Sequence, residues 1–151
     1  MEMPRWLNHV AIIIDHAHRD IGPYLEEYLQ SYNITVDESP ASAKYWLVVE
    51  QDNLQQHIAS VSSSTTPRQY EIVYTLQFKL LKAKGAEILP TSTVSVTRQA
   101  TINSDRILGS NQEEILLINE MRRDAVVQLI NRISKTVGRS PPGDKYGLIR
   151  K

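Results

Sequence analysis

The residues from position 70 to position 80 alternate between two kinds of side chain without interruption. Successive side chains of a β-strand point to opposite faces of the sheet, so this pattern is typical of a strand about ten residues long with one covered face. Such a strand must lie in a sheet whose other layer supplies apolar cover. The apolar even positions are Tyr70, Ile72, Tyr74, Leu76, Phe78 and Leu80, and the odd positions are Glu71, Val73, Thr75, Gln77 and Lys79.

A second alternating segment follows a short turn at residues 82–85 and predicts an antiparallel partner. If Leu81 lies opposite Glu87, the numbers of opposed residues sum to about 168, so even positions face even positions. Tyr70 is then expected opposite Arg98, and Tyr74 opposite Val94. The two strands share one apolar face, and the ribbon is longer than the usual ~5–6 residues. The apolar positions of the second segment are Ile88, Val94, Val96, Ala100 and Ile102.

The remaining elements complete a small α+β unit. The β-branched run Val10–Ile14 and the apolar run Tyr45–Val49 each predict a strand. Apolar residues at helical spacing over Ile21–Tyr32 predict a first helix, and Asn111 with Glu114 resembles a capping box that opens a second helix ending near Lys135. The order β-α-β-β-β-α predicts a two-layer sandwich, with two helices packed on one face of a four-stranded sheet.

Length and composition indicate a single domain. We expect the domain to occupy residues 1–138, with a basic and disordered tail over 139–151 that contains Pro141, Pro142 and Gly143. Ile34–Val36 is interpreted as a short extended piece rather than as a full strand. Seventeen basic and seventeen acidic residues cancel, which gives no electrostatic reason to expect nucleic acid as a partner.

The chain contains no cysteine, so disulfides, thiol nucleophiles and thiolate metal sites are excluded within it. The longest apolar run, Val10–Ile14, is far shorter than the ~20 residues that a spanning helix needs. The first residues lack the apolar segment of a signal peptide, and we expect none in this chain.

No motif indicates catalysis, a metal or a cofactor. Asp15, His16 and His18 follow a strand and could share a metal, but two imidazoles at this spacing do not complete a ligand set, and a solvated turn is favoured. The hydroxyl-rich segment 62–66 has no adjacent base and no oxyanion-hole signature. We therefore expect no catalytic residue, no metal ligand and no cofactor, and an enzyme acting through Asp15, His16 and His18 is a remote alternative.

Two groups of residues are candidates for binding. Hairpin geometry brings Arg68, Arg98 and Arg106 to one end of the sheet, where guanidinium groups can hold phosphates or carboxylates, although a solvated, salt-bridged rim is the favoured interpretation. Arg122 falls within the apolar stripe of the second helix and is expected to pair with an acid or to extend to solvent. The candidate partner-binding residues lie on the polar face of the hairpin, or on the side of the second helix opposite its apolar stripe, which we expect to be exposed: Thr75, Gln77, Thr93, Ser95, Thr97, Thr101, Leu117 and Met121.

From Leu7 to about Ser134 the sequence resembles the LptE family of lipopolysaccharide-assembly lipoproteins, also called rare lipoprotein B. The resemblance depends on the strand Arg68–Tyr74, the Lys84-Gly85 turn followed by Leu89-Pro90, and the strand through Arg98. It extends to the helix, where Asn111-Gln112-Glu113-Glu114 and the later Glu-Met-x-x-x-Ala stretch at 120–125 match the family's order and spacing.

The resemblance implies a non-enzymatic lipoprotein of the outer membrane that faces the periplasm, plugs the LptD β-barrel and binds lipopolysaccharide. Family members carry a lipidated cysteine after a signal peptide, and this chain has neither, so the anchor would belong to the full-length precursor. At the positions of the family's basic lipopolysaccharide contacts this chain has Ser63 and Ser110, with Arg68 and Arg106 as neighbours. The alternative from another class is a periplasmic lipoprotein that scaffolds or activates a cell-wall enzyme.

Overall fold

The computed structural model describes residues 3–58, 68–102 and 112–139 of the chain. Its elements are β1 (His9–His16), α1 (Ile21–Gln30), β2 (Thr35–Val36), the 3₁₀ helix η1 (Pro40–Ser42), β3 (Tyr45–Ile58), β4 (Arg68–Lys82), β5 (Glu87–Ile102) and α2 (Gln112–Thr136). The expected tail lies almost wholly outside these ranges, and Asn111 of the expected capping box and Arg106 lie outside them as well.

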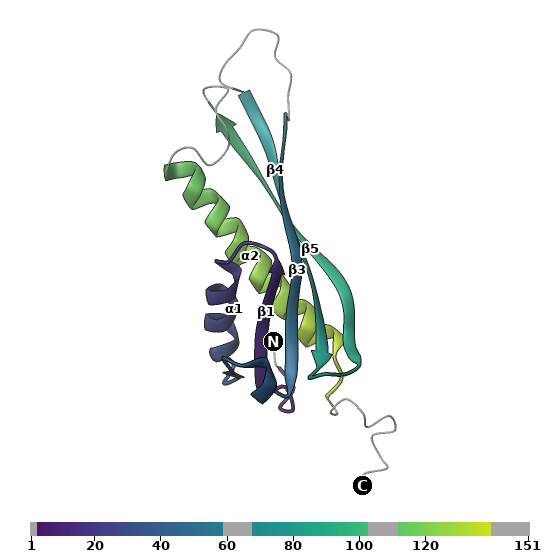
Figure 1. The fold of residues 1–151 in the computed structure, drawn as a ribbon. Coiled ribbons are helices and arrows are strands. Elements are labelled where there is room, and N and C mark those ends of the chain that lie inside the picture. Colours follow the sequence, from purple (N-terminus) through teal and green to yellow (C-terminus); the bar gives the residue numbers. More distant parts are fainter. Residues whose placement is uncertain (1–2, 59–67, 103–111, 140–151) are drawn as a thin grey trace.

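The fold is α+β, with two helices and one mixed sheet in the order β2-β1-β3-β4-β5. β1 runs parallel to β2 and β3, whereas β3, β4 and β5 are mutually antiparallel. The prediction of four strands is wrong by one, because Thr35 and Val36 pair with His9 and Val10 and add a short edge strand. Figure 1 shows that β3, β4 and β5 extend well beyond β1 and α1 as a twisted ribbon.

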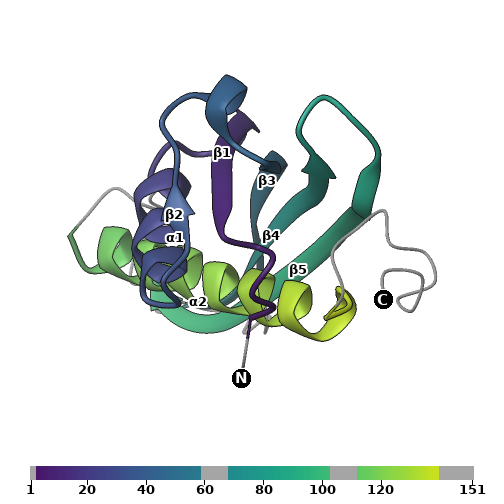
Figure 2. The ribbon, with the colours of Figure 1, turned by 90° about the horizontal axis from the view of Figure 1, so that it is seen from below.

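Both helices cover the same face of the sheet, as viewed along the strands in Figure 2. The even residues of β4 point to this face, and Ile72, Leu76, Phe78 and Leu80 are wholly buried. Leu25 and Leu29 of α1 and Leu129 and Ile130 of α2 complete the same core. The predicted two-layer arrangement and the predicted apolar face of the hairpin are therefore confirmed.

The register of the β4–β5 hairpin differs from the prediction by two residues. Leu81 does pair with Glu87, but Tyr74 lies opposite Val96 instead of Val94, and Tyr70 opposite Ala100 instead of Arg98. Irregular pairing on either side of Leu80 inserts the extra residues into β5 close to Pro90. Proline has no N–H to offer a ladder, and a bulge accommodates the residues that cannot pair regularly. A shift of two leaves every side chain on its predicted face.

β3 changes the phase of its alternation part-way along. Leu47 and Val49 face the helices, and a bulge between Val49 and Gln51 then places Asp52 and Leu54 on that face. The apolar run at the start of β3 and the polar remainder therefore form one continuous strand of 14 residues. The bulge carries an acidic side chain, Asp52, to the edge of the core.

The buried side of α2 keeps most of the stripe that helical spacing predicts but is wider, and it differs at the first turn. The predicted stripe residues that are buried are Ile118, Val126, Leu129, Ile130 and Ile133. Ile115 and Leu116 are 44% and 62% exposed, whereas Met121 is fully buried and Leu117 packs against the core. The expectation that Leu117 and Met121 form an exposed docking surface is wrong for this reason. The helix buries a stripe centred on Met121 and Ala125, because α2 crosses the sheet diagonally and its first turn projects past the helix-covered core (Figure 1).

Truncating Met121 tests this orientation. Met121→Ala removes a wholly buried side chain and leaves a cavity, so we expect the free energy of unfolding to fall by about 2–5 kcal/mol. Leu116→Ala is the matched control on the same helix and should change it by about 0.5 kcal/mol or less. Denaturant unfolding measures both values, and equal effects of the two substitutions would contradict the observed packing of α2.

Candidate functional site

The face of β3, β4 and β5 that points away from the helices, here called the outer face, is predominantly polar. Its side chains stand in register: Asn53 lies opposite Thr75, and Thr75 opposite Ser95. Gln51 donates through Nε2 to the Oε1 atom of Gln77 at 2.5 Å. The six predicted hairpin residues all lie on this outer face: Thr75 and Gln77 are half-buried, and Thr93, Ser95, Thr97 and Thr101 are exposed. Their contact with a partner stays a prediction.

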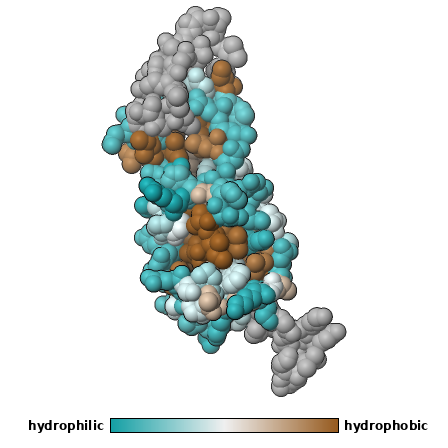
Figure 3. Space-filling model, in the orientation of Figure 1, coloured by the Kyte–Doolittle hydropathy of each residue, from teal (hydrophilic) through white to brown (hydrophobic). Residues whose placement is uncertain are grey.

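The outer face becomes apolar toward β1. Ile13 lies opposite Val48 and Trp46 opposite Leu81, which places the four side chains on one surface. Trp46 donates through Nε1 to the backbone oxygen of Pro40 at 2.8 Å, so η1 lies beside this area. Figure 3 shows the apolar surface over β1 and β3, with hydrophilic surface around it. The outer face therefore offers both apolar area and hydrogen-bonding groups.

The three candidate arginines do not form one described cluster. Arg68 pairs through its backbone with Ile102 at the far end of the ribbon, as the hairpin geometry predicts. Arg98 lies opposite Ile72, four residues further in, and forms a salt bridge and hydrogen bond with Asp124 of α2. The side chain of Arg68 and the whole of Arg106 lie outside the described residues. Arg98 therefore has a structural role as a link between β5 and α2.

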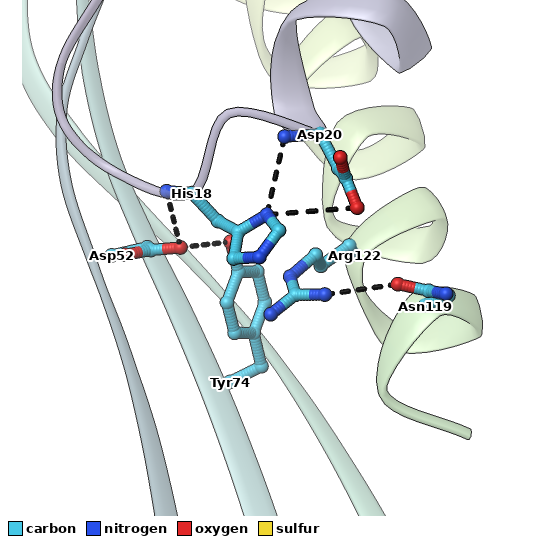
Figure 4. Close-up of polar contacts among 6 residues, drawn as sticks. All are labelled: His18, Asp20, Asp52, Tyr74, Asn119 and Arg122. Atoms are coloured by element: carbon cyan, nitrogen blue, oxygen red, sulfur yellow. Dashed lines mark hydrogen bonds and ion pairs between the residues drawn. The ribbon is translucent and has the colours of Figure 1, made fainter. Parts of the chain in front are cut away.

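A polar cluster lies where the core ends, between β3, β4, α2 and the loop that precedes α1 (Figure 4). The hydroxyl of Tyr74 donates to the Oδ2 atom of Asp52 at 2.7 Å, and the backbone N–H of His18 donates to the same oxygen at 3.1 Å. Arg122 donates to Oδ1 of Asn119 at 2.9 Å and points toward Tyr74. The structure thus places Arg122 among polar partners within the helix stripe.

Burial and the hydrogen bond to the Asp52 carboxylate raise the pKa of Tyr74 far above its usual value, and the positive charge of Arg122 opposes this increase. The phenol therefore stays neutral and acts as a donor. The arrangement fixes the β1–α1 loop to the sheet, because a single carboxylate oxygen accepts from both β4 and the loop. Among the described residues, Nε of Arg122 is buried without a hydrogen-bond partner.

The side chains of the sequence motif at Asp15–His18 make local polar contacts. Nδ1 of His16 lies 3.4 Å from the Asp15 carboxylate, while Nδ1 of His18 accepts from the backbone N–H of Asp20 at 3.1 Å. In the described ranges, no group of three potential metal-ligating side chains comes together. His16 is the last residue of β1, and His18 lies in the turn before α1.

A family model for lipopolysaccharide assembly, LptE, matches residues 7–133. The chain belongs to the LptE family. The resemblance seen in the sequence is thereby confirmed, and membership assigns this LptE protein to lipopolysaccharide assembly. No curated protein matches the chain. The helices described here include none that is both long enough and apolar enough to span a membrane.

Solved structures of bacterial lipoproteins share the LptE fold. A lipoprotein B from Nitrosomonas europaea is 25% identical, with a TM-score of 0.71, over 88% of this chain and 84% of that one. The rare lipoprotein B of Shewanella oneidensis is 17% identical, with a TM-score of 0.68, over 85% and 96%. A minor lipoprotein of Acinetobacter baumannii is 17% identical, with a TM-score of 0.67, over 86% and 94%.

Removing the Tyr74 hydroxyl tests the polar cluster. Tyr74→Phe deletes a hydrogen bond to a charged group and should lower the free energy of unfolding by about 1.5–3 kcal/mol at neutral pH. Tyr24→Phe keeps its ring beneath Arg123 and should cost about 0.5 kcal/mol or less.

The same substitution should change the alkaline limb of the stability curve. Because the pKa of Tyr74 is raised in the folded state, its contribution is fully present below about pH 10 and falls as the unfolded tyrosine ionises above that pH. Tyr74→Phe should therefore lose stability less steeply above pH 10 than the parent chain. Denaturant unfolding at a series of alkaline pH values measures the difference, and parallel curves would contradict the assignment.

Proposed function

We propose that this chain acts as a non-catalytic lipopolysaccharide-assembly factor that plugs the LptD β-barrel and binds lipopolysaccharide during its delivery to the cell surface. Membership of the LptE family supports the assembly role. The observation that carries the plug role is the outer face, which the two helices leave uncovered over the length of β4 and β5.

The chemistry of the outer face suits the lumen of a barrel. Large outer-membrane barrels are polar inside, so a protein seated there needs hydrogen-bonding groups rather than an apolar coat. Thr93, Ser95 and Thr97 offer short neutral donors and acceptors in regular array. A permanent complex of this kind should bury more than ~2,000 Å² in total. The apolar area at Ile13 and Val48 would contribute at one end of the contact.

Arginine side chains at the far end of the ribbon are the proposed contacts for lipopolysaccharide. A guanidinium group can hold a phosphate through two parallel hydrogen bonds. Arg68 and Arg106 are the favoured pair, because Arg98 is engaged with Asp124. Arg98 is the third candidate. Its ion pair with Asp124 would also hold the end of the ribbon in place relative to α2.

The location proposed is the periplasmic side of the outer membrane. The structural relatives from three bacteria are all described as lipoproteins, and a lipid anchor would require a cysteine that the 151 residues lack. The competing role, a scaffold for a cell-wall enzyme, predicts a different partner on the same outer face. Co-purification with a β-barrel separates the two roles.

Photo-crosslinking tests the plug role. A crosslinking residue at Thr75, Thr93, Ser95 or Thr97 should trap a large outer-membrane β-barrel in intact cells. The exposed Glu26 and Glu27 of α1 serve as control positions and should give little of this product. Products from α1 alone would reverse the proposed orientation, and capture of a cell-wall enzyme would favour the scaffold role.

Charge reversal tests the ligand site. Arg68→Glu and Arg106→Glu should each weaken lipopolysaccharide binding by about 1–3 kcal/mol, because each removes a charge-assisted contact. Folding stability should stay within about 1 kcal/mol, as expected for charges at a rim. Lys82→Glu with Lys84→Glu is the control at the opposite end of the ribbon. The assignment would be overturned if the affinity for lipopolysaccharide stayed unchanged in both arginine variants and fell in the lysine control.

A further inference from the structure

Cationic side chains from four separate segments gather at the end of the molecule opposite the tip of the ribbon. This surface, here called the basic end, is the end seen in Figure 2, where the N-terminal segment crosses from the helix layer to the sheet. It carries the first residues, the start of β3, the β4–β5 turn and the end of α2. The cations of the basic end are Arg5, Lys44, Lys82, Lys84, Lys135 and Arg139, and all six are exposed.

Hydrogen bonds and an aromatic ring contact hold these segments together. The backbone N–H of Ala83 donates to the oxygen of Lys44 at 3.0 Å, which joins the β4–β5 turn to the start of β3. Trp6 donates through Nε1 to the oxygen of Gly138 at 2.8 Å, and its ring packs edge-on against Tyr45 with 5.1 Å between ring centroids. Trp6 therefore connects the end of α2 to the start of β3, so the four segments that carry the cations adjoin one another.

The helix side of the basic end contains a surface cavity of about 610 Å³. Arg5 and Arg139 line it together with Met3 and Tyr32. Lys135 lines an adjoining smaller cavity that also contains Met3 and Arg139. Cationic groups thus surround apolar and aromatic side chains, which is the composition expected where a protein meets the headgroup region of a membrane.

Asp37 and Glu87 are acids close to the basic end. The side chain of Asp37 is mostly buried and lies 3.6 Å from His9, and Glu87 stands opposite Leu81 in the hairpin. The chain as a whole is neutral, so the concentration of cations at one end gives the molecule a lengthwise charge asymmetry. Clusters of four to eight basic residues are sufficient to attract an anionic lipid surface.

We propose that the basic end docks on the surface of a bilayer rich in anionic phospholipid. The cations would contact headgroup phosphates, with Met3 and Tyr32 at the level of the glycerol groups. Cations that come from four segments and are spread over one end of the molecule fit a planar sheet of headgroups better than the linear backbone of a nucleic acid, which basic grooves follow. This site is distinct from the proposed lipopolysaccharide contacts at the other end and does not depend on them.

Vesicle sedimentation with the 151-residue chain tests the proposal without a lipid anchor. The parent protein should bind vesicles of phosphatidylcholine mixed with phosphatidylglycerol, should not bind phosphatidylcholine alone, and should dissociate as salt is raised. Arg5→Glu, Lys44→Glu, Lys82→Glu and Lys135→Glu combined should weaken binding by about tenfold or more. The matched control, Arg19→Glu with Arg123→Glu, reverses exposed cations elsewhere and should bind as the parent does.

The proposal would be overturned if the parent chain did not bind vesicles that contain phosphatidylglycerol. It would also be overturned if the control and the fourfold variant lost vesicle binding equally. Binding that appears only when lipopolysaccharide or single-stranded nucleic acid replaces the phospholipid would overturn it as well. Thermal unfolding of each variant shows whether it is still folded. Should the fourfold variant fail to fold, the pairs Arg5→Glu with Lys135→Glu and Lys44→Glu with Lys82→Glu give the same test, each with an expected loss of at least about threefold.

Discussion

The packing of α2 across the apolar face of β4 and β5 is the interaction on which the rest of the structure depends. Met121 and Ala125 are wholly buried at the centre of this contact. Two consecutive residues of the helix then attach it on both sides: Arg123 lies over the ring of Tyr24 in α1, and Asp124 forms an ion pair with Arg98 in β5. Because one helix contacts both partners, the position of α1 and the twist of the ribbon are set together.

The sequence predicted the elements whose pattern is local. Alternation over residues 70–80 identified the buried face of β4, and helical spacing placed both helices within a few residues of their bounds. The register of the hairpin was missed because the bulge near Pro90 depends on how two strands pair, which hairpin counting ignores. β2 was missed as a strand because two residues, Thr35 and Val36, carry too short a pattern to be recognised.

The candidate site was predicted only in part, because local patterns can be recognised in the sequence whereas bulges and helix packing cannot. The polar outer face follows directly from strand alternation, so its residues could be named in advance. Asp52 could not be placed beside Tyr74, because the bulge in β3 reverses the phase of alternation between Val49 and Gln51. Helical spacing identified most of the buried side of α2, but the width of that side depends on how the helix crosses the sheet, and Met121 was consequently assigned to solvent.

The position of β5 at the end of the strand order leaves a long strand edge exposed until the protein binds a partner. Among the described strands β5 has only β4 as a neighbour, so one side of a 16-residue strand keeps its backbone groups unpaired. An exposed edge of this length is a template for strand addition by a second chain, which is a route to aggregation. Pro90 interrupts the template near one end, whereas the stretch from Thr93 to Thr101 has no such interruption. A newly made chain therefore gains from a chaperone, or from rapid assembly, that shields this edge.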